Sequence, residues 1–258
     1  MDAIVTAGGV PKEGDPLYEY TQGAPKAMLD LAGKPMVQWV LDALSESQAI
    51  ERVVVVGLDE ELGLYCSKPL FFIPNQGSML ENIYAGANKI LSLNPNAGVL
   101  LSVSSDIPAI TGEIVDWMVS EIEKGEYDVY YNVITRQDME NRFPGSKRSF
   151  TRFKDVEVCG GDMTAFRASM LNTEGSVWQE LIGARKNVFR QAAIIGFGTL
   201  FLLAFRQLTL DDAVERVAKR LQIRARAIRC PYPELGMDVD KPFQMDLLHA
   251  ELAQREAL

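Results

Sequence analysis

Hydrophobic residues recur along this chain with two different spacings, which alternate from the N-terminus onward. Continuous apolar runs of strand length occupy 3–7, 53–56 and 99–103. Stretches with apolar residues three or four positions apart occupy 35–47, 78–91 and 111–124. A continuous run indicates a strand buried on both faces of a parallel sheet, and the second spacing predicts a helix with one buried face. This alternation predicts an α/β domain.

Local signals refine two of these helices. Ser78 and Glu81 have the spacing of a capping box, and the helix that follows is expected to bury Met79 with its other apolar residues. Thr111 is expected to cap the next helix.

The second half of the chain has less regular spacing. The predicted elements are a strand at 127–134, a polar loop at 135–149, a ribbon at 150–158, a helical stretch at 185–221, a half-buried strand at 223–228 and a helix that starts near 242. Basic residues around the ribbon fit either an acceptor phosphate or ordinary solvated loop charges: Lys147, Arg148, Arg152 and Lys154.

A pair of glycines, Gly8 and Gly9, follows the first apolar run, and Lys26 follows Pro25 in a polar loop. Glycines let a phosphate or base approach the backbone closely, and a lysine supplies a cation for a triphosphate. The glycine pair alone fits an ordinary turn equally well. Neither G-x-x-x-x-G-K-[ST] nor a helix-opening G-x-G-x-x-G is present, which excludes two common nucleotide motifs.

Two aspartates follow apolar segments at positions suited to ligands. Asp106 follows the predicted strand that begins at Val99. It is therefore expected at the carboxyl edge of the parallel sheet, where ligands bind. Asp240 precedes a Lys-Pro step near the C-terminus, with Asp238 as an alternative. Mg²⁺ takes one or two carboxylates together with phosphate and water oxygens. Each aspartate taken alone also fits a capping or surface role.

Composition excludes several classes of function. With 26 basic and 35 acidic residues in 258, the formal charge is −9, which argues against non-specific nucleic-acid binding. Cys66, Cys159 and Cys230 are widely separated, and His249 is the single histidine, so a zinc cluster or a histidine-based triad is not expected. The N-terminus lacks the pattern of a signal peptide, and a cytoplasmic protein is expected.

Residues 185–229 differ from the rest, with ten basic and three acidic residues. The run 194–205 within them is apolar throughout but shorter than the ~20 residues of a bilayer span. Core packing or a homodimer interface would bury it, and contact with a membrane surface is the alternative. We expect one domain, 1–258, with 185–229 as a basic and apolar helical insertion.

The motifs, in this order, resemble those of GT-A-type nucleotidyltransferases, and most closely those of the molybdenum-cofactor-type (MobA-like) NTP transferases. The resemblance covers nearly the whole chain. It departs at the family's glycine-rich loop, which normally contains an arginine. Here the sequence VPKEGDPLYEY replaces that loop, and Lys12 is its only early cation. The matching segments are Ala7-Gly8-Gly9, Pro25-Lys26, Gly33-Lys34-Pro35-Met36-Val37, Asn75-Gln76-Gly77-Ser78, Ser105-Asp106-Ile107-Pro108 and Asp238-Val239-Asp240-Lys241-Pro242.

The resemblance implies a Rossmann-like three-layer α/β/α fold with a mostly parallel mixed sheet. It implies Mg²⁺ on Asp106 and Asp240, and catalytic cations at Lys26 and Lys12. Residues at the family's nucleotide-binding positions are Ala7, Gly8, Gly9, Lys26, Gly77, Ser78 and Asp106.

The implied reaction transfers a nucleoside monophosphate from an NTP to a phosphorylated small-molecule acceptor and releases pyrophosphate. The base of the NTP and the identity of the acceptor stay open. One alternative is a GT-A glycosyltransferase that uses a nucleotide sugar, since Asp238-Val239-Asp240 has the D-x-D spelling. Another is a non-catalytic nucleotide-binding protein at a membrane surface.

Overall fold

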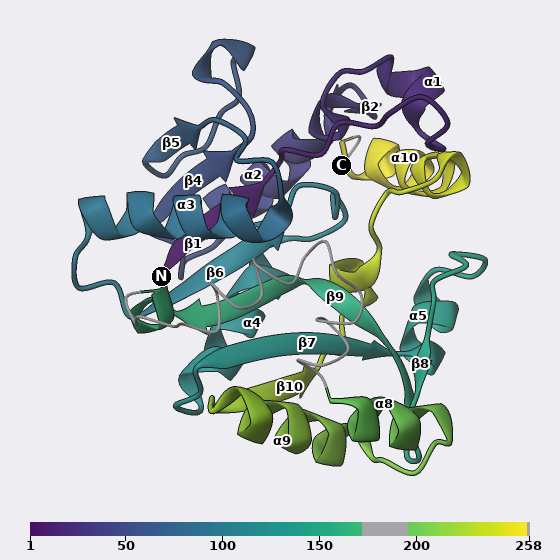
Figure 1. Cartoon of the computed structure of the whole chain (residues 1–258). Coiled ribbons are helices and arrows are strands. Elements are labelled where there is room, and N and C mark those ends of the chain that lie inside the picture. The colour runs from purple at the N-terminus through teal and green to yellow at the C-terminus, as the bar shows by residue number, and fades with distance from the viewer. Residues whose placement is uncertain (172–195, 257–258) are drawn as a thin grey trace.

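The computed structural model describes residues 1–171 and 196–256. Its main sheet has eight strands, seven of them in the order β10-β7-β9-β6-β1-β4-β5, and β8 pairs with β9 (Figure 1). The strands are β1 (Asp2–Thr6), β4 (Arg52–Val56), β5 (Leu70–Ile73), β6 (Val99–Ser104), β7 (Val129–Thr135), β8 (Thr151–Arg152), β9 (Glu157–Arg167) and β10 (Ala225–Arg229). A separate pair is formed by β2 (Asp30–Leu31) and β3 (Lys34–Pro35).

The sheet is mixed but mostly parallel. Strand β1 pairs in parallel with β4 and β6, β4 with β5, and β7 with β10. Strand β9 runs antiparallel to β6, β7 and β8. The carboxyl ends of β1, β4 and β6 therefore meet at one edge, where ligands of open α/β sheets bind.

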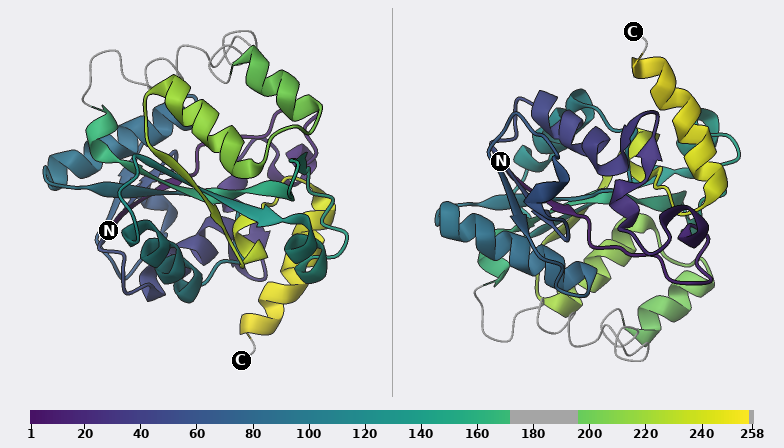
Figure 2. Two further views of the ribbon diagram at one scale, coloured as in Figure 1. Left: turned by 90° about the horizontal axis from the view of Figure 1, so that it is seen from below. Right: turned by 90° about the horizontal axis from the view of Figure 1, so that it is seen from above.

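Helices cover both faces of this sheet (Figure 2). They are α1 (Tyr18–Thr21), α2 (Met36–Glu46), α3 (Met79–Leu93), α4 (Gly112–Glu123), α5 (Arg136–Arg142), α8 (Phe197–Ala204), α9 (Leu210–Leu221) and α10 (Pro242–Glu256). Short 3-10 turns occupy Lys26–Met28, Glu60–Leu62, Ala168–Leu171 and Pro233–Gly236. Helices α2 and α4 lie on one face, and α3 and α9 lie on the other. The predicted three-layer α/β/α fold is confirmed.

Sequence pattern explains most of these elements. The β-branched run of β4 is buried between the two helical layers, and four of its five residues are fully covered. The side chains of Ser78 and Thr111 accept backbone N–H groups at the starts of α3 and α4, as predicted. Met79 departs from the prediction, since 65% of its surface is exposed. It is the first residue of α3 and lies beyond the part of the helix that packs on the sheet.

The polar loop predicted at 135–149 is wrong in part, because α5 forms within it. Thr135 caps this helix by accepting the N–H of Asp138 at 3.1 Å and donating its hydroxyl to the Asp138 carboxylate at 2.6 Å. Met139 alone is buried among the seven residues of the helix. A helix with so narrow an apolar face leaves no periodic signal in the sequence.

The helical stretch predicted at 185–221 falls partly on residues outside the described ranges. The described part holds two helices, α8 and α9, with 205–209 between them. Strand β10 then pairs with β7 at one end of the main sheet, so the C-terminal end of the basic segment 185–229 belongs to the core fold. Three of its basic side chains meet acidic partners in ion pairs: Arg224 with Asp128, Arg226 with Glu121, and Arg229 with Asp155.

Within the apolar run at 194–205, Phe201 and Phe205 are 63% and 61% exposed. Complete burial of the run inside the chain, one of the outcomes considered above, therefore does not hold for these two residues. Among the described residues, no helix has the length and hydrophobicity that a bilayer crossing requires.

Candidate active site

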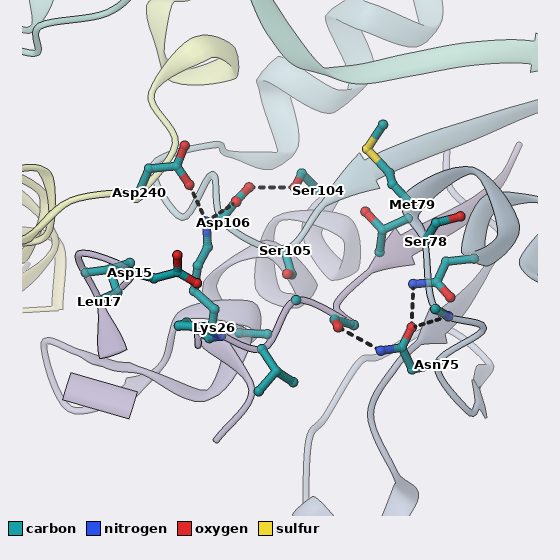
Figure 3. A pocket seen from close by; sticks show the side chains of 18 of the residues that line it. Asp15, Leu17, Lys26, Asn75, Ser78, Met79, Ser104, Ser105, Asp106 and Asp240 are labelled. Atoms are coloured by element: carbon teal, nitrogen blue, oxygen red, sulfur yellow. Dashed lines mark hydrogen bonds and ion pairs between the residues drawn. The ribbon is translucent and has the colours of Figure 1, made fainter. Parts of the chain in front are cut away.

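A cavity of about 610 Å³ opens at the sheet edge where β1 and β6 end. Five separate parts of the chain line it: the turn after β1, the loop from 15 to 27 that carries Lys26, the start of α3 with the residues before it, the end of β6 and the loop before α10. Figure 3 shows side chains from these parts of the chain facing a common space. Of the predicted site residues, the structure brings Gly8, Gly9, Lys26, Gly77, Ser78, Asp106 and Asp240 to this cavity.

Lys26 joins the two predicted metal ligands. Its Nζ lies 2.6 Å from Asp106 Oδ2 and 2.6 Å from Asp240 Oδ1 (Figure 3). Ser104 donates its hydroxyl to the other oxygen of Asp106 at 2.5 Å. Burial disfavours the charged ammonium, but attraction and hydrogen bonds from the two carboxylates outweigh it and raise the pKa of Lys26. The ammonium therefore stays protonated.

Backbone contacts fix the loop that carries Asp240. The N–H of Val239 donates to the carbonyl oxygen of Asp106 at 2.9 Å, and the N–H of Asp240 donates to Gln244 Oε1 at 3.0 Å. The side chain of Asp240 is 56% exposed and faces the cavity. These contacts hold the two aspartates in reach of one cation.

Asp238, the alternative ligand, pairs with a different cation. It is 8% exposed and forms a close ion pair with Arg148 Nη1. Arg148 Nη2 also donates to the carbonyl oxygen of Gly160 at 3.4 Å and lies 3.8 Å from Asp162 Oδ2. Arg148 therefore links the loop after α5, strand β9 and the Asp240 loop.

This second cluster is electrostatically unusual. In the part of the chain that the structure describes, Asp162 Oδ2 and Arg148 Nε are buried without a hydrogen-bond partner. Burial, with the charges of Asp238 and Asp106, raises the pKa of Asp162 to about 7. Burial also raises the pKa of Asp238, to about 6, although Arg148 opposes the shift. No local feature of the sequence indicated the pairing of Asp162 and Asp238 with Arg148.

The two glycines after β1 have different surroundings. A Cβ on Gly8 would lie 2.7 Å from the side chains of Asn75 and Asn82, and a Cβ on Gly57 would lie 2.3 Å from the Cα of Gly8. A Cβ on Gly9 would meet nothing within 4 Å. Close internal packing thus explains Gly8, and only Gly9 has open space for a ligand beside it.

An amide network absent from the sequence prediction holds the far wall of the cavity. Asn75 Nδ2 donates to the carbonyl oxygen of Gly8 at 2.8 Å, and Asn75 Oδ1 accepts from Gly77 N at 3.0 Å and Asn82 Nδ2 at 3.1 Å (Figure 3). Asn82 is 4% exposed. The sequence signal for this network was Asn82, a polar residue on the otherwise apolar face of α3.

Ser78 lines the cavity, but its hydroxyl is engaged as a helix cap. It accepts the N–H of Glu81 at 3.3 Å and donates to the Glu81 carboxylate at 2.7 Å. Met79 lies beside it at the cavity rim, which accounts for its exposure (Figure 3). The structural role predicted for Ser78 is confirmed, while contact with a nucleotide stays a prediction.

Two predicted residues do not reach the cavity. Ala7 is 1% exposed and donates its N–H to the carbonyl oxygen of Val56 at 2.8 Å, as an extension of β1. Lys12 lies in the exposed loop that replaces the family's arginine, and its N–H donates to Asp15 Oδ2 at 2.7 Å. Lys241, which the sequence prediction did not assign to the site, lines the cavity instead.

The donor set of the site suits a divalent cation that keeps other ligands. Residues 1–171 and 196–256 contain no group of three or more His, Cys, Asp or Glu side chains able to hold a metal. Asp106 and Asp240 supply two convergent carboxylates, and Mg²⁺ binds readily to one or two carboxylates plus phosphate and water oxygens. The residues present therefore fit Mg²⁺ bound together with a phosphate-bearing substrate.

Several known proteins resemble this chain. A probable molybdenum cofactor guanylyltransferase from Natranaerobius thermophilus is 26% identical over 140 residues, which are 52% of this chain and 61% of that protein. The chain thus matches less than two thirds of that relative's length. A hypothetical transferase structure from Thermus thermophilus superposes with a TM-score of 0.80 at 29% identity, covering 95% of this chain and 98% of that one.

More distant structures share the fold. A CMP:2-keto-3-deoxy-manno-octonic acid synthetase complexed with CTP has a TM-score of 0.58 at 14% identity, with 98% of both chains covered. A 4-diphosphocytidyl-2C-methyl-D-erythritol synthase from Anaerococcus prevotii has a TM-score of 0.56 at 11% identity, with 97% of this chain and 95% of that one covered. The family model described as the MobA-like NTP transferase domain matches residues 3–190. This chain belongs to the family of MobA-like NTP transferase domains.

Proposed function

We propose that this protein is a nucleotidyltransferase that moves a nucleoside monophosphate from an NTP to a phosphorylated small-molecule acceptor. The observation that carries the proposal is the position of Lys26 Nζ, 2.6 Å from both Asp106 and Asp240 beside the cavity. A cation next to paired carboxylates suits a triphosphate bound with a divalent metal. Family membership supports the same chemistry.

In the proposed reaction, a phosphate oxygen of the acceptor attacks the α-phosphorus of the NTP. A bond forms between that oxygen and the α-phosphorus, the α–β phosphoanhydride bond breaks, and pyrophosphate leaves with the electron pair. Lys26 neutralises charge on the phosphates, and the open backbone at Gly9 admits them. The acceptor phosphate is already an anion, so no general base is required. The exposed position of His249 on α10 agrees with this.

We assign the metal role to Asp106 and Asp240. When bound, Mg²⁺ would supply a positive charge that offsets the phosphates and helps to orient them. Ser104 would hold the Asp106 carboxylate through its 2.5 Å hydrogen bond, and Gln244 would hold the Asp240 backbone. The ion pair of Asp238 with Arg148 favours Asp240 over Asp238 for this role.

The glycosyltransferase alternative receives less support. A D-x-D motif works by presenting its metal ligands to a nucleotide sugar, but here Asp238 is buried against Arg148 while Asp240 faces the cavity. The lysine between Asp106 and Asp240 also suits a triphosphate better than a diphosphate sugar. The same cavity would also suit a non-catalytic nucleotide-binding protein. An activity assay distinguishes that hypothesis from an enzyme.

The test is a pyrophosphate-release assay with each of the four NTPs, crossed with a panel of phosphorylated acceptors, in Mg²⁺ and in EDTA. We expect release with at least one pair, dependent on Mg²⁺ and on Asp106. Nucleotide sugars with non-phosphorylated acceptors form the second arm. Sugar transfer there, without pyrophosphate release from any NTP, would favour the glycosyltransferase. NTP binding without any product would favour the non-catalytic protein.

Three further expectations stay as proposals: a cytoplasmic location, a homodimer and contact with a membrane surface through 185–229. Exposed Phe201 and Phe205 on and after α8 support a covered apolar surface there. Sedimentation of the chain alone and flotation with anionic vesicles separate the last two. A monomer that does not float would contradict both.

A further inference from the structure

Lys26 occupies the place at which a divalent cation would meet its two carboxylates. Its Nζ lies 2.6 Å from an oxygen of Asp106 and 2.6 Å from an oxygen of Asp240. Mg²⁺ binds carboxylate oxygens at ~2.0–2.1 Å, so a metal shared by the same two oxygens would fall within van der Waals distance of the ammonium. The two cations therefore exclude one another at this pair.

The lysine main chain is fixed while its side chain has room to turn. The backbone N–H of Lys26 donates to the carbonyl oxygen of Gly9 at 2.9 Å, and this ties the residue to the turn after β1. The space beside Gly9 is open and belongs to the same cavity. A four-carbon stem can carry the ammonium from the carboxylates into this space without moving the backbone.

Without Lys26, the two carboxylates would lose the cation that contacts both of them. The ammonium of Lys26 forms an ion pair of 2.6 Å with each of them. Lys241 also lines the cavity, but it forms no ion pair with another described residue. Lys26 is thus the cation in direct contact with both carboxylates of this pair.

We infer that Lys26 blocks the carboxylate pair against free divalent metal until a triphosphate offers its ammonium another anionic partner. This inference rests on the proposed function. Triphosphate binding releases Asp106 and Asp240, which then take the metal that accompanies the nucleotide. Coupling of this kind is reciprocal, because the metal in turn keeps Lys26 on the phosphates. The site therefore loads nucleotide and metal together and does not take up the metal first.

The test measures binding of Mn²⁺ alone to the full chain, without nucleotide, by the loss of the free-ion electron paramagnetic resonance signal. Wild type is compared with Lys26→Met and with Lys241→Met, which removes the same charge from a cavity residue outside the ion pairs. We expect Lys26→Met to bind Mn²⁺ about tenfold or more tightly than wild type, within the usual ~5–150-fold range of site coupling. We expect Lys241→Met to change affinity by at most about fivefold, the scale of an exposed charge.

A thermal-melting series provides a second readout that does not depend on activity. Mn²⁺ is expected to raise the Tm of Lys26→Met more than that of wild type, and Lys26→Gln is expected to behave like Lys26→Met. Equal Mn²⁺ affinities for Lys26→Met and Lys241→Met would overturn the inference.

A double variant separates this failure from failure of the proposed function. Asp106→Asn in the Lys26→Met background should abolish the gained Mn²⁺ affinity. If single-variant affinities are equal but Asp106→Asn still abolishes binding, the blocking role fails while the metal assignment stands. If Asp106→Asn changes nothing, the metal assignment in the proposed function fails as well.

Discussion

The backbone N–H of Val239 donates a hydrogen bond of 2.9 Å to the carbonyl oxygen of Asp106. This contact joins the end of β6 to the loop before α10, two segments far apart in the sequence. It places the Asp240 side chain beside Asp106 through main-chain atoms alone. Side-chain substitutions at either aspartate should therefore leave the loop in position and report on chemistry.

Asp106→Asn tests the carboxylate itself. If Asp106 holds the metal, we expect kcat/KM to fall roughly 10²–10³-fold, the usual loss for one electrostatic contact to reacting groups. Ser104→Ala removes only the hydroxyl that orients Asp106 Oδ1, and a hydrogen bond to a charged group contributes about 1.5–3 kcal/mol. Its expected loss is nearer tenfold. Steady-state pyrophosphate release over a Mg²⁺ titration measures both, and equal rates for wild type and Asp106→Asn would refute the assignment.

Substitutions of the paired glycines should separate packing from ligand contact. Gly8→Ala places a Cβ 2.7 Å from Asn75 and Asn82, whose amides are held by hydrogen bonds, so overpacking should cost about 1–3 kcal/mol of unfolding free energy. Gly9→Ala meets no atom within 4 Å and should change stability by less than about 0.5 kcal/mol. It should instead raise the KM for the NTP. Urea unfolding measures the stability of both variants, and steady-state kinetics measures their KM for the NTP. Similar unfolding free energies for Gly8→Ala and Gly9→Ala would contradict the packing explanation of Gly8.

Arg148→Met should destabilise the fold strongly. It leaves Asp238 buried without its partner, and breaking one side of a buried ion pair costs about 3–5 kcal/mol. Adding Asp238→Asn should recover much of this loss, because the uncompensated charge disappears. A double-mutant cycle in urea gives the coupling. Additive effects of the two substitutions would show that the pair contributes nothing.

Asp128 should give the fold part of its sensitivity to acid. Hydrogen bonds from Arg224, which outweigh burial, lower the pKa of Asp128. A carboxyl with a lowered folded-state pKa stabilises the fold above its unfolded-state pKa and loses that effect as pH falls through the folded value. Asp128→Asn should therefore flatten the decline of unfolding free energy at acidic pH. Asp59→Asn, an exposed control with no ion pair among the described residues, should follow wild type.

The order of the motifs along the chain, through their resemblance to a known family, predicted the residues that meet at the cavity. Lys26 follows Pro25, Asp106 follows an apolar run, and Asp240 precedes the Lys241-Pro242 step. Strands β1, β4 and β6 and helices α2, α3 and α4 followed from apolar spacing. Lys12 also follows a proline, Pro11, yet the structure leaves it outside the cavity, so this local signal did not distinguish the two lysines.

Pairings between distant residues were beyond sequence reasoning. Arg148 and Asp238 are 90 positions apart, and each taken singly reads as a surface charge. The amide network of Asn75 and Asn82 depends on how closely α3 approaches the turn at Gly8, which no local pattern encodes. Helix α5 was missed for a different reason, since its cap is polar and its buried face is a single methionine.

The most direct measurement is a crystal structure with Mn²⁺ and a non-hydrolysable analogue of the NTP that supports pyrophosphate release. The account predicts an anomalous peak between the carboxylates of Asp106 and Asp240, with Lys26 Nζ moved onto the triphosphate. A triphosphate bound away from this edge of the sheet, or a Lys26 that still bridges both aspartates with the metal elsewhere, would contradict it.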